Sequence, residues 1–181
     1  MSFNPKQEYL IVEDKIRLKD FHDYTDYYIT RPPYQRKAVW SVKKQQALID
    51  SIFRRYYVPK LVIREVRLSD EKTVNEIIDG QQRITTLMIL FCVIRDLFPN
   101  INEELSEKDP FAVDIDTIKS SIALHGKTNR LKLVTHIQHQ SDFDELILKG
   151  DTTKLKKPYK YQVRTDEEPK YKFINTAFLF R

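Results

Sequence analysis

The stretch IIDGQQRITTL, residues 77–87, decides the fold, because an apolar strand passes through one glycine directly into a helix. The strand is predicted over 73–78, and it pairs in a hairpin with a strand predicted over 60–68. The helix is predicted over 84–98 and is apolar on nearly every side, so we expect it to be buried.

Outward from this unit, turn and capping signals place shorter elements. Two prolines, Pro32 and Pro33, hold the chain extended, and Ser41 is a suitable N-cap. The remaining expected elements are a helix over 16–24, a strand over 27–30, a helix from Ser41 to about Tyr56, a strand over 130–135, a helix from Ser141 to near Gly150 and a helix from Pro169 to the last residues. The segment 100–127 has no pattern that places an element.

These elements predict an α+β fold, with a small sheet flanked by helices and a helical C-terminal extension. We expect residues 1–150 to form one domain. Residues 151–181 are expected to form a basic loop and the start of a helical region that belongs to something longer, because the last helix has no stop signal.

Composition restricts the class of protein. The 181 residues include 41% hydrophobic and 31% charged residues, a balance that argues against disorder. The net charge of +5 and the pI near 9.1 give a mild bias towards anionic partners. The N-terminus lacks a signal-peptide pattern, the longest apolar run, 87–94, is too short to span a bilayer, and Cys92 is the single cysteine. We therefore expect a cytoplasmic protein without a membrane partner or a structural metal.

The junction between the strand and the buried helix has the chemistry of a phosphate site. A helix start leaves backbone N–H groups unpaired and carries partial positive charge, and Gly80 lets a ligand approach the backbone. Arg83 lies in the first turn, where its guanidinium can reach phosphate oxygens. The candidate ligand-binding residues also include Gln81, Gln82, Thr85 and Thr86.

A purely structural interpretation has about equal weight for this segment alone. Asp79 would then cap the helix, Gly80 would make the turn, and Arg83 would pair with a surface carboxylate.

A second stretch, residues 34–40, adds to the functional interpretation by placing two cations beside two aromatic rings. Arg36 could clamp a phosphate and Tyr34 could stack on a base. Trp40 is more typical of a core or lid residue. Lys60 could face the same pocket, although a solvated lysine is the more common case.

Taken together, these motifs resemble a known family. Tyr34-Gln35-Arg36 with Trp40, the run LIDSI at 48–52, Val58-Pro59 and the 77–87 stretch resemble the DGQQR-motif domain. This is the N-terminal nucleotide-hydrolysing domain of GmrSD-type modification-dependent restriction systems and of the similar SspE defence protein. It is similar to the ParB/sulfiredoxin fold.

The resemblance implies roles for individual residues. Gly80, Gln81, Gln82 and Arg83 would bind the nucleotide phosphates, and Gln35 and Arg36 would close the pocket from the other side. Asp79 would position the loop or act on a metal-bound or attacking water. The resemblance thus implies a catalytic set of Asp79, Gln82 and Arg83, and a nucleotide-binding set of Tyr34, Gln35, Arg36, Gly80, Gln81, Gln82, Arg83, Thr85 and Thr86.

The first functional hypothesis is a nucleoside triphosphatase that regulates a defence nuclease, with Mg²⁺ accompanying the nucleotide. Family members often carry an HNH nuclease domain, but His125, His136 and His139 do not form an HNH pattern. We therefore expect the nuclease to lie in another part of the protein or in a partner.

Two alternatives remain open. One is a non-catalytic module that binds a nucleotide or DNA, with phosphate contacts from the basic loop. The other is a scaffold whose last helix docks a partner through its apolar face, residues 173–180. The candidate DNA-binding residues are Lys154, Lys156, Lys157 and Lys160, with Arg164 in the same loop.

Overall fold

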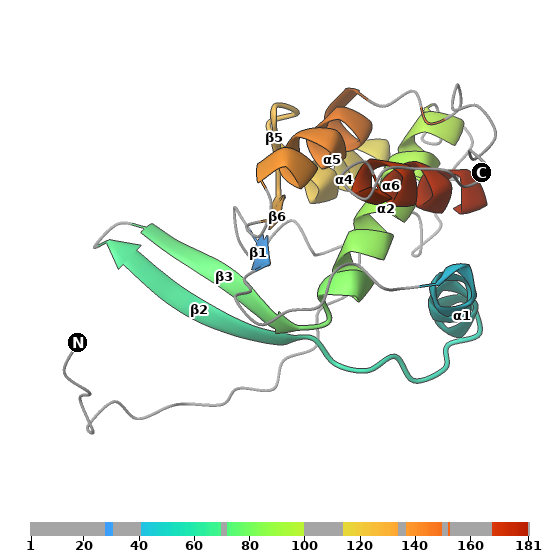
Figure 1. Cartoon of the computed structure of the whole chain (residues 1–181), viewed down its shortest axis with the longest axis horizontal. Coiled ribbons are helices and arrows are strands. Elements are labelled where there is room, and N and C mark those ends of the chain that lie inside the picture. The colour runs from blue at the N-terminus through green and yellow to red at the C-terminus, as the bar shows by residue number, and fades with distance from the viewer. Residues whose placement is uncertain are drawn as a thin grey trace.

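A computed structural model of the chain describes residues 28–30, 41–69, 72–99, 114–133, 137–149, 152 and 168–180 (Figure 1). The strands are β1 (Tyr28–Thr30), β2 (Val62–Ser69), β3 (Lys72–Asp79), β4 (Ala123–Leu124), β5 (Thr128–Asn129) and β6 (Leu131–Leu133). The helices are α1 (Val42–Phe53), α2 (Gln81–Leu97), α4 (Ile115–Ile122), α5 (Ile137–Lys149) and α6 (Glu168–Phe180). A small sheet beside separate helices confirms the predicted α+β class.

The main sheet has four strands in the order β2-β3-β1-β6. The predicted hairpin is confirmed, since β2 and β3 pair antiparallel, whereas β1 runs parallel to β3 and to β6. Arg64 and Glu76 lie directly opposite each other in the hairpin, and Arg64 donates hydrogen bonds to the buried Glu76 carboxylate. The hairpin extends away from the helices (Figure 1), so its base, where β3 meets α2, is the part next to the core.

Helix α2 is the centre of the core, as its apolar sequence predicts. It contacts α4, α5 and α6, which gather around its C-terminal half (Figure 1). It begins at Gln81 rather than at Ile84, because Gly80 takes the N-cap position and the polar residues 81–83 form the first turn. The core residues are Ile77, Ile84, Met88, Ile89, Cys92, Val93, Ile118, Ile122, Ala123, Leu131, Phe143, Leu146, Ile147, Phe173 and Ala177.

Helix α1 ends at Phe53, three residues before the predicted end. Arg55 adopts a left-handed conformation with φ 57°, and its N–H donates to the carbonyl oxygen of Ile52. The N–H of Tyr56 donates to Ser51 O at 2.8 Å. These two bonds form a Schellman motif, with Arg55 in the place that glycine usually takes. The motif reverses the chain, so that the segment after it returns beside α1.

Helix α4 lies in the stretch for which the sequence pattern placed no element. Its N-cap is Asp114, whose side chain accepts a hydrogen bond from the Thr117 N–H at 2.6 Å. That bond from the backbone amide of Thr117 lowers the pKa of Asp114. Ile118 and Ile122 then face the core, one turn apart. The β4–β5 hairpin follows, with positive φ at His125 and Gly126 in its turn.

Helix α5 begins earlier than predicted, at Ile137 instead of Ser141. Helix α6 begins at Glu168 and has Pro169 in its first turn, as predicted. Both pack on the core, where the rings of Phe143 and Phe173 lie 5.1 Å apart between centroids and Ala177 is fully buried. Part of the apolar face of α6 therefore packs against the chain itself. The division into domains at residue 150 stays a prediction.

A buried polar cluster joins the C-terminal half of α2 to the end of α5. Arg95 donates to the carbonyl oxygen of Ile147 at 2.7 Å and to Asp96 at 2.8 Å. Asp96 also accepts hydrogen bonds from the N–H and the hydroxyl of Thr152, at 3.0 and 2.6 Å. The cluster satisfies a carbonyl group near the C-terminal end of α5, where a cation is favourable.

No helix in the described part of the chain is both long enough and apolar enough to cross a bilayer.

Candidate functional site

The turn between β3 and α2 depends on a glycine in a left-handed conformation. Gly80 has φ 94°, is buried, and accepts the first helical hydrogen bond from Ile84 N–H at 3.0 Å. A Cβ on this residue would lie 2.2 Å from Cδ2 of Leu61. Gly80, and not Asp79, therefore occupies the N-cap position, and no side chain caps the helix there.

Arg83 lies along this turn with its side chain 13% exposed. Its Nη2 donates to the carbonyl oxygen of Lys60 and to Oδ2 of Asp79, each at 2.9 Å. The Asp79 side chain is 69% exposed, so the pairing of Arg83 with a surface carboxylate that belongs to the purely structural interpretation is present. The Nε of Arg83 is buried and has no acceptor among the described residues. This guanidinium thus keeps a donor that the described part of the chain does not use.

The other polar residues of the turn are bonded to the backbone of β3 and α2. Gln81 Nε2 donates to Ile77 O at 2.8 Å. The Thr85 and Thr86 hydroxyls donate to the carbonyl oxygens of Gln81 and Gln82, at 2.9 and 2.8 Å. Each of these hydroxyls donates its proton inside the helix. Thr86 is also buried, so of the two only Thr85 can face a ligand, and only as an acceptor.

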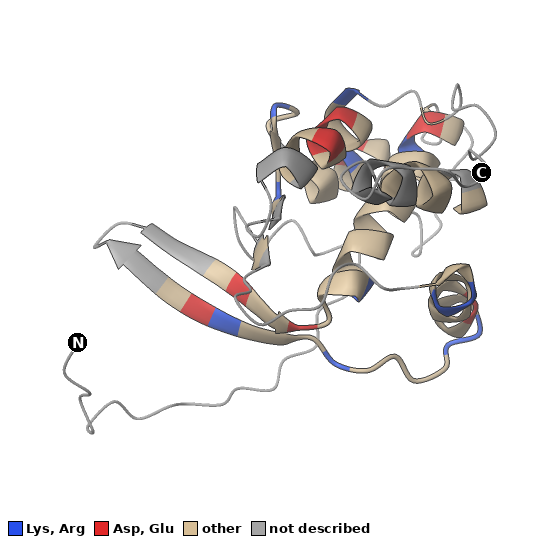
Figure 2. Cartoon of the chain, viewed as in Figure 1, with Lys and Arg blue, Asp and Glu red and all other residues tan. Residues whose placement is uncertain are grey.

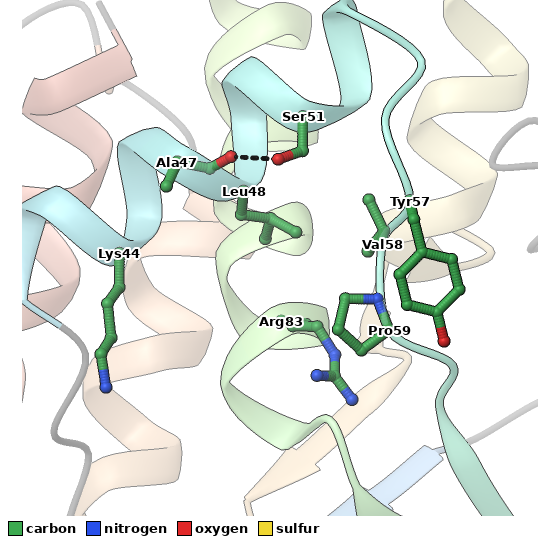
Figure 3. A pocket seen from close by; sticks show the side chains of 8 residues that line it. All are labelled: Lys44, Ala47, Leu48, Ser51, Tyr57, Val58, Pro59 and Arg83. Carbon is green, nitrogen blue, oxygen red and sulfur yellow. Dashed lines mark hydrogen bonds between the residues drawn. The ribbon is translucent and has the colours of Figure 1, made fainter.

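A pocket of about 230 Å³ opens beside Arg83 (Figure 3). One wall comes from α1, the other comes from the segment that follows the Schellman motif, and Arg83 reaches in from α2. Most of the lining is apolar. The lining residues are Lys44, Ala47, Leu48, Ser51, Tyr57, Val58, Pro59 and Arg83.

The pocket brings in residues that were not among the sequence candidates. Lys44, Ala47, Leu48 and Ser51 are spaced i, i+3, i+4 and i+7, so they share one face of α1. That spacing is visible in the sequence, but it became informative only with the position of α2 opposite. Lys60, for which a solvated side chain was the more common case, contributes its carbonyl group to Arg83.

Positive charge predominates along α1 and the segment that follows it (Figure 2). Between Ser41 and Leu61 the sequence has five cationic side chains and one carboxylate, Asp50. Arg54 pairs with that carboxylate at 2.7 Å on the surface. The cationic residues are Lys43, Lys44, Arg54, Arg55 and Lys60. This excess attracts anions to α1 and the segment after it, where Lys44 lines the pocket.

Several predicted site residues cannot be placed relative to the pocket. Tyr34, Gln35 and Arg36 lie outside the described residues, as do the basic-loop lysines. The structure therefore brings together Asp79, Gly80 and Arg83 from the sequence candidates, and it adds the α1 face. In the described ranges, no three histidine, cysteine or acidic side chains lie close enough together to hold a metal ion.

The fold is a small α+β domain. Its buried helix α2 has Gly80 at the N-cap position and Arg83 in its first turn, beside an apolar pocket. A family model described as the GmrSD restriction endonuclease, N-terminal domain, matches residues 17–180. The chain belongs to this family of restriction-system proteins. No match was found among curated proteins.

Proposed function

We propose that this domain binds a nucleoside triphosphate at the turn from Asp79 to Arg83 and hydrolyses it. In the proposal, the nucleotide state regulates a nuclease in another part of the protein or in a partner, within a DNA modification-dependent restriction system. A ParB/sulfiredoxin-like arrangement around the DGQQR motif is part of the same proposal. The single observation that carries it is the nearly buried Arg83, whose Nε lacks an acceptor in the described part of the chain, next to the pocket at the start of α2.

The chemistry asked of the domain is mainly positioning and charge neutralisation, since phosphoryl transfer needs little covalent help from a protein. The first-turn amides of α2 would meet phosphate oxygens, because a helix start leaves N–H groups without intrahelical acceptors. Arg83 would donate from Nε while its Nη2 stays on Lys60 O and Asp79. A guanidinium held in this way loses little entropy when a phosphate binds.

Asp79 and Gln82 have supporting roles in the proposal. The exposed Asp79 carboxylate holds Arg83 on one side and can accept a proton from a water on its other oxygen. Gln82 lies in the first turn and would orient that water or a phosphate oxygen. Thr85 would act as an acceptor only, and the buried Thr86 would support the first turn of the helix through its bond to Gln82 O.

The residues at the turn fit Mg²⁺ only if the nucleotide supplies most of its ligands. Asp79 is the one carboxylate between residues 77 and 87, so it is the residue of the turn that would contribute. Mg²⁺ usually takes one or two carboxylates together with phosphate oxygens and water. When bound, it would neutralise charge on the phosphates.

The test of hydrolysis is phosphate release from GTP, ATP and CTP with Mg²⁺ by wild type and by Arg83→Ala. We expect wild type to exceed the buffer rate and Arg83→Ala to lose about hundredfold or more. Arg54→Ala is the matched control, because Arg54 is an exposed arginine that does not line the pocket. A wild-type rate equal to that of buffer would remove hydrolysis by this chain from the proposal.

A second candidate is nucleotide binding without turnover, with DNA held by the basic loop. The pairing of Asp79 with Arg83 favours it, because the guanidinium already occupies Oδ2 of Asp79 and leaves only the other carboxylate oxygen for an attacking water. Binding of a triphosphate with no phosphate release would support this candidate. For DNA, affinity for a labelled duplex should fall steeply with salt and on joint replacement of Lys154, Lys156, Lys157 and Lys160 by alanine.

A further inference from the structure

The pocket beside Arg83 is lined largely by hydrocarbon. Ala47 and Leu48 face it from α1, and Val58 and Pro59 face it from the returning segment (Figure 3). Tyr57 stands at the side of the opening, and 77% of this residue is exposed. A large aromatic side chain left in water beside an apolar hollow is a surface on which a flat ring can bury apolar area.

The size of the pocket limits what it can hold. Its volume of about 230 Å³ is below the roughly 300–1,000 Å³ of pockets that enclose a whole small molecule. One portion of a nucleotide fits this description better than an entire triphosphate. The apolar lining selects the base, because phosphates require charged donors on several sides.

Arg83 connects the pocket to the turn. Its guanidinium is a lining group of the pocket, and its Nη2 lies 2.9 Å from where a Cβ on Gly80 would be. A ligand seated in the pocket therefore has one end at Arg83 and, immediately beyond it, the start of α2. The polar atoms at the pocket edge differ in kind: Lys44 only donates, whereas Ser51 Oγ gives its proton to Ala47 O at 2.7 Å and can accept.

We propose that this pocket is the base-binding subsite, with the base on Tyr57 and Pro59 and the phosphates directed towards Gly80 and Arg83. This inference rests on the proposed function, because it assumes that the anion at the turn belongs to a nucleotide. It assigns Tyr57 as a stacking residue and Ala47 as an exposed wall residue of the subsite, roles that the sequence motifs do not include.

The experiment measures the affinity of non-hydrolysable triphosphate analogues and of inorganic tripolyphosphate, with Mg²⁺, by calorimetry. The variants are Tyr57→Ala, which removes the stacking ring, and Ala47→Trp, which fills the pocket from an exposed helix position. The matched controls are Tyr56→Ala and Gln46→Trp, which change neighbouring exposed residues outside the lining. Far-UV circular dichroism compares the fold of all four with that of wild type.

We expect each pocket variant to lower the affinity for the triphosphate analogues about tenfold (about 1.4 kcal/mol) and to leave the affinity for tripolyphosphate unchanged. Both control variants should bind like wild type. The base subsite is overturned if wild type binds an analogue but the two variants bind it equally well, or lose analogue and tripolyphosphate alike. The proposed function survives that result. If wild type binds no analogue, the proposed function fails, and the subsite fails with it.

Discussion

Leu61 occupies the space in which a side chain on Gly80 would lie, since a Cβ there would come within 2.2 Å of Leu61 Cδ2. Leu61 belongs to the segment that leads into β2 and packs, partly buried, against the core. The same segment supplies Lys60 O to Arg83. The strand entrance and the turn before α2 are therefore fitted to each other by one apolar contact and one hydrogen bond.

Gly80→Ala is expected to lower the free energy of unfolding by about 2–3 kcal/mol, measured in urea. A left-handed backbone costs a non-glycine residue about 1–2 kcal/mol, and the contact with Leu61 adds to that cost. Gly126→Ala is the matched control, because Gly126 has φ 68° but no atom within 4 Å of a Cβ. The Gly126→Ala variant should lose only the free energy that a left-handed backbone costs a non-glycine residue. Equal losses at the two positions would mean that Leu61 moves aside without cost.

Arg55→Gly is expected to raise the free energy of unfolding by up to about 1 kcal/mol. Arg55 holds φ 57° in the Schellman motif at the end of α1, and glycine relieves that strain, although it loses more chain entropy on folding. Arg54→Gly is the matched control, because Arg54 has φ −84° and is not strained. This variant should lower the free energy of unfolding. Both variants are measured by thermal or urea unfolding. A change of stability in the same direction for both would contradict this account.

Cys92 should make stability fall in alkaline solution. The thiol is fully buried, and burial raises its pKa from 9.0 to about 12. Above pH 9 the unfolded state releases this proton while the folded state keeps it, so stability declines by about 1.4 kcal/mol per pH unit until about pH 12.

The measurement for Cys92 is urea unfolding of wild type and Cys92→Ala at pH 8 and pH 10.5. The stability difference between them should shrink by about 2 kcal/mol at the higher pH, because only wild type carries the thiol. Other titrating groups are common to both proteins and cancel. An unchanged difference would show that the thiol ionises normally, and rapid alkylation of the folded protein at pH 8 would lead to the same conclusion.

Asp96→Asn is expected to cost about 3 kcal/mol at pH 7, because it leaves the buried guanidinium of Arg95 without its carboxylate. Burial alone would raise the pKa of Asp96, but hydrogen bonds from Arg95 and Thr152 outweigh it, so the pKa lies below 3.8. The stabilisation is therefore present above about pH 4 and is lost as the pH falls through the lowered pKa.

The control for Asp96 is Asp116→Asn, which changes a carboxylate that is 80% exposed and pairs with Lys119 on the surface. That pair should contribute under about 1 kcal/mol. Unfolding followed from pH 7 to pH 2.5 should show the penalty of Asp96→Asn shrinking by up to about 1.8 kcal/mol, because about 1.4 kcal/mol is lost per pH unit below 3.8. A penalty that persisted unchanged in acid would mean that charge on Asp96 is not its source.

The hairpin, the buried helix and the glycine turn could be predicted from the sequence because each has a local cause. Runs rich in valine and isoleucine, separated by polar residues, predict β2 and β3, an all-round apolar surface predicts α2, and Gly80 permits a backbone that other residues avoid. The polar character of the turn was also readable, since Arg83 follows the glycine by three residues.

The tertiary structure decided what lies opposite those elements. Arg55 ends α1 in a conformation that its residue type disfavours, and the pocket exists because the chain then returns past Arg83. Helix α4 carries local signals, an Asp114 N-cap and isoleucines at 115, 118 and 122, but the position of α2 decides which side of it is buried. Local sequence sets the backbone conformation of a residue and the apolar periodicity of its segment. Burial and hydrogen-bond partners depend on segments distant in the chain; the bond from Arg83 to Lys60 O is an example. These long-range contacts are set only when the whole core packs.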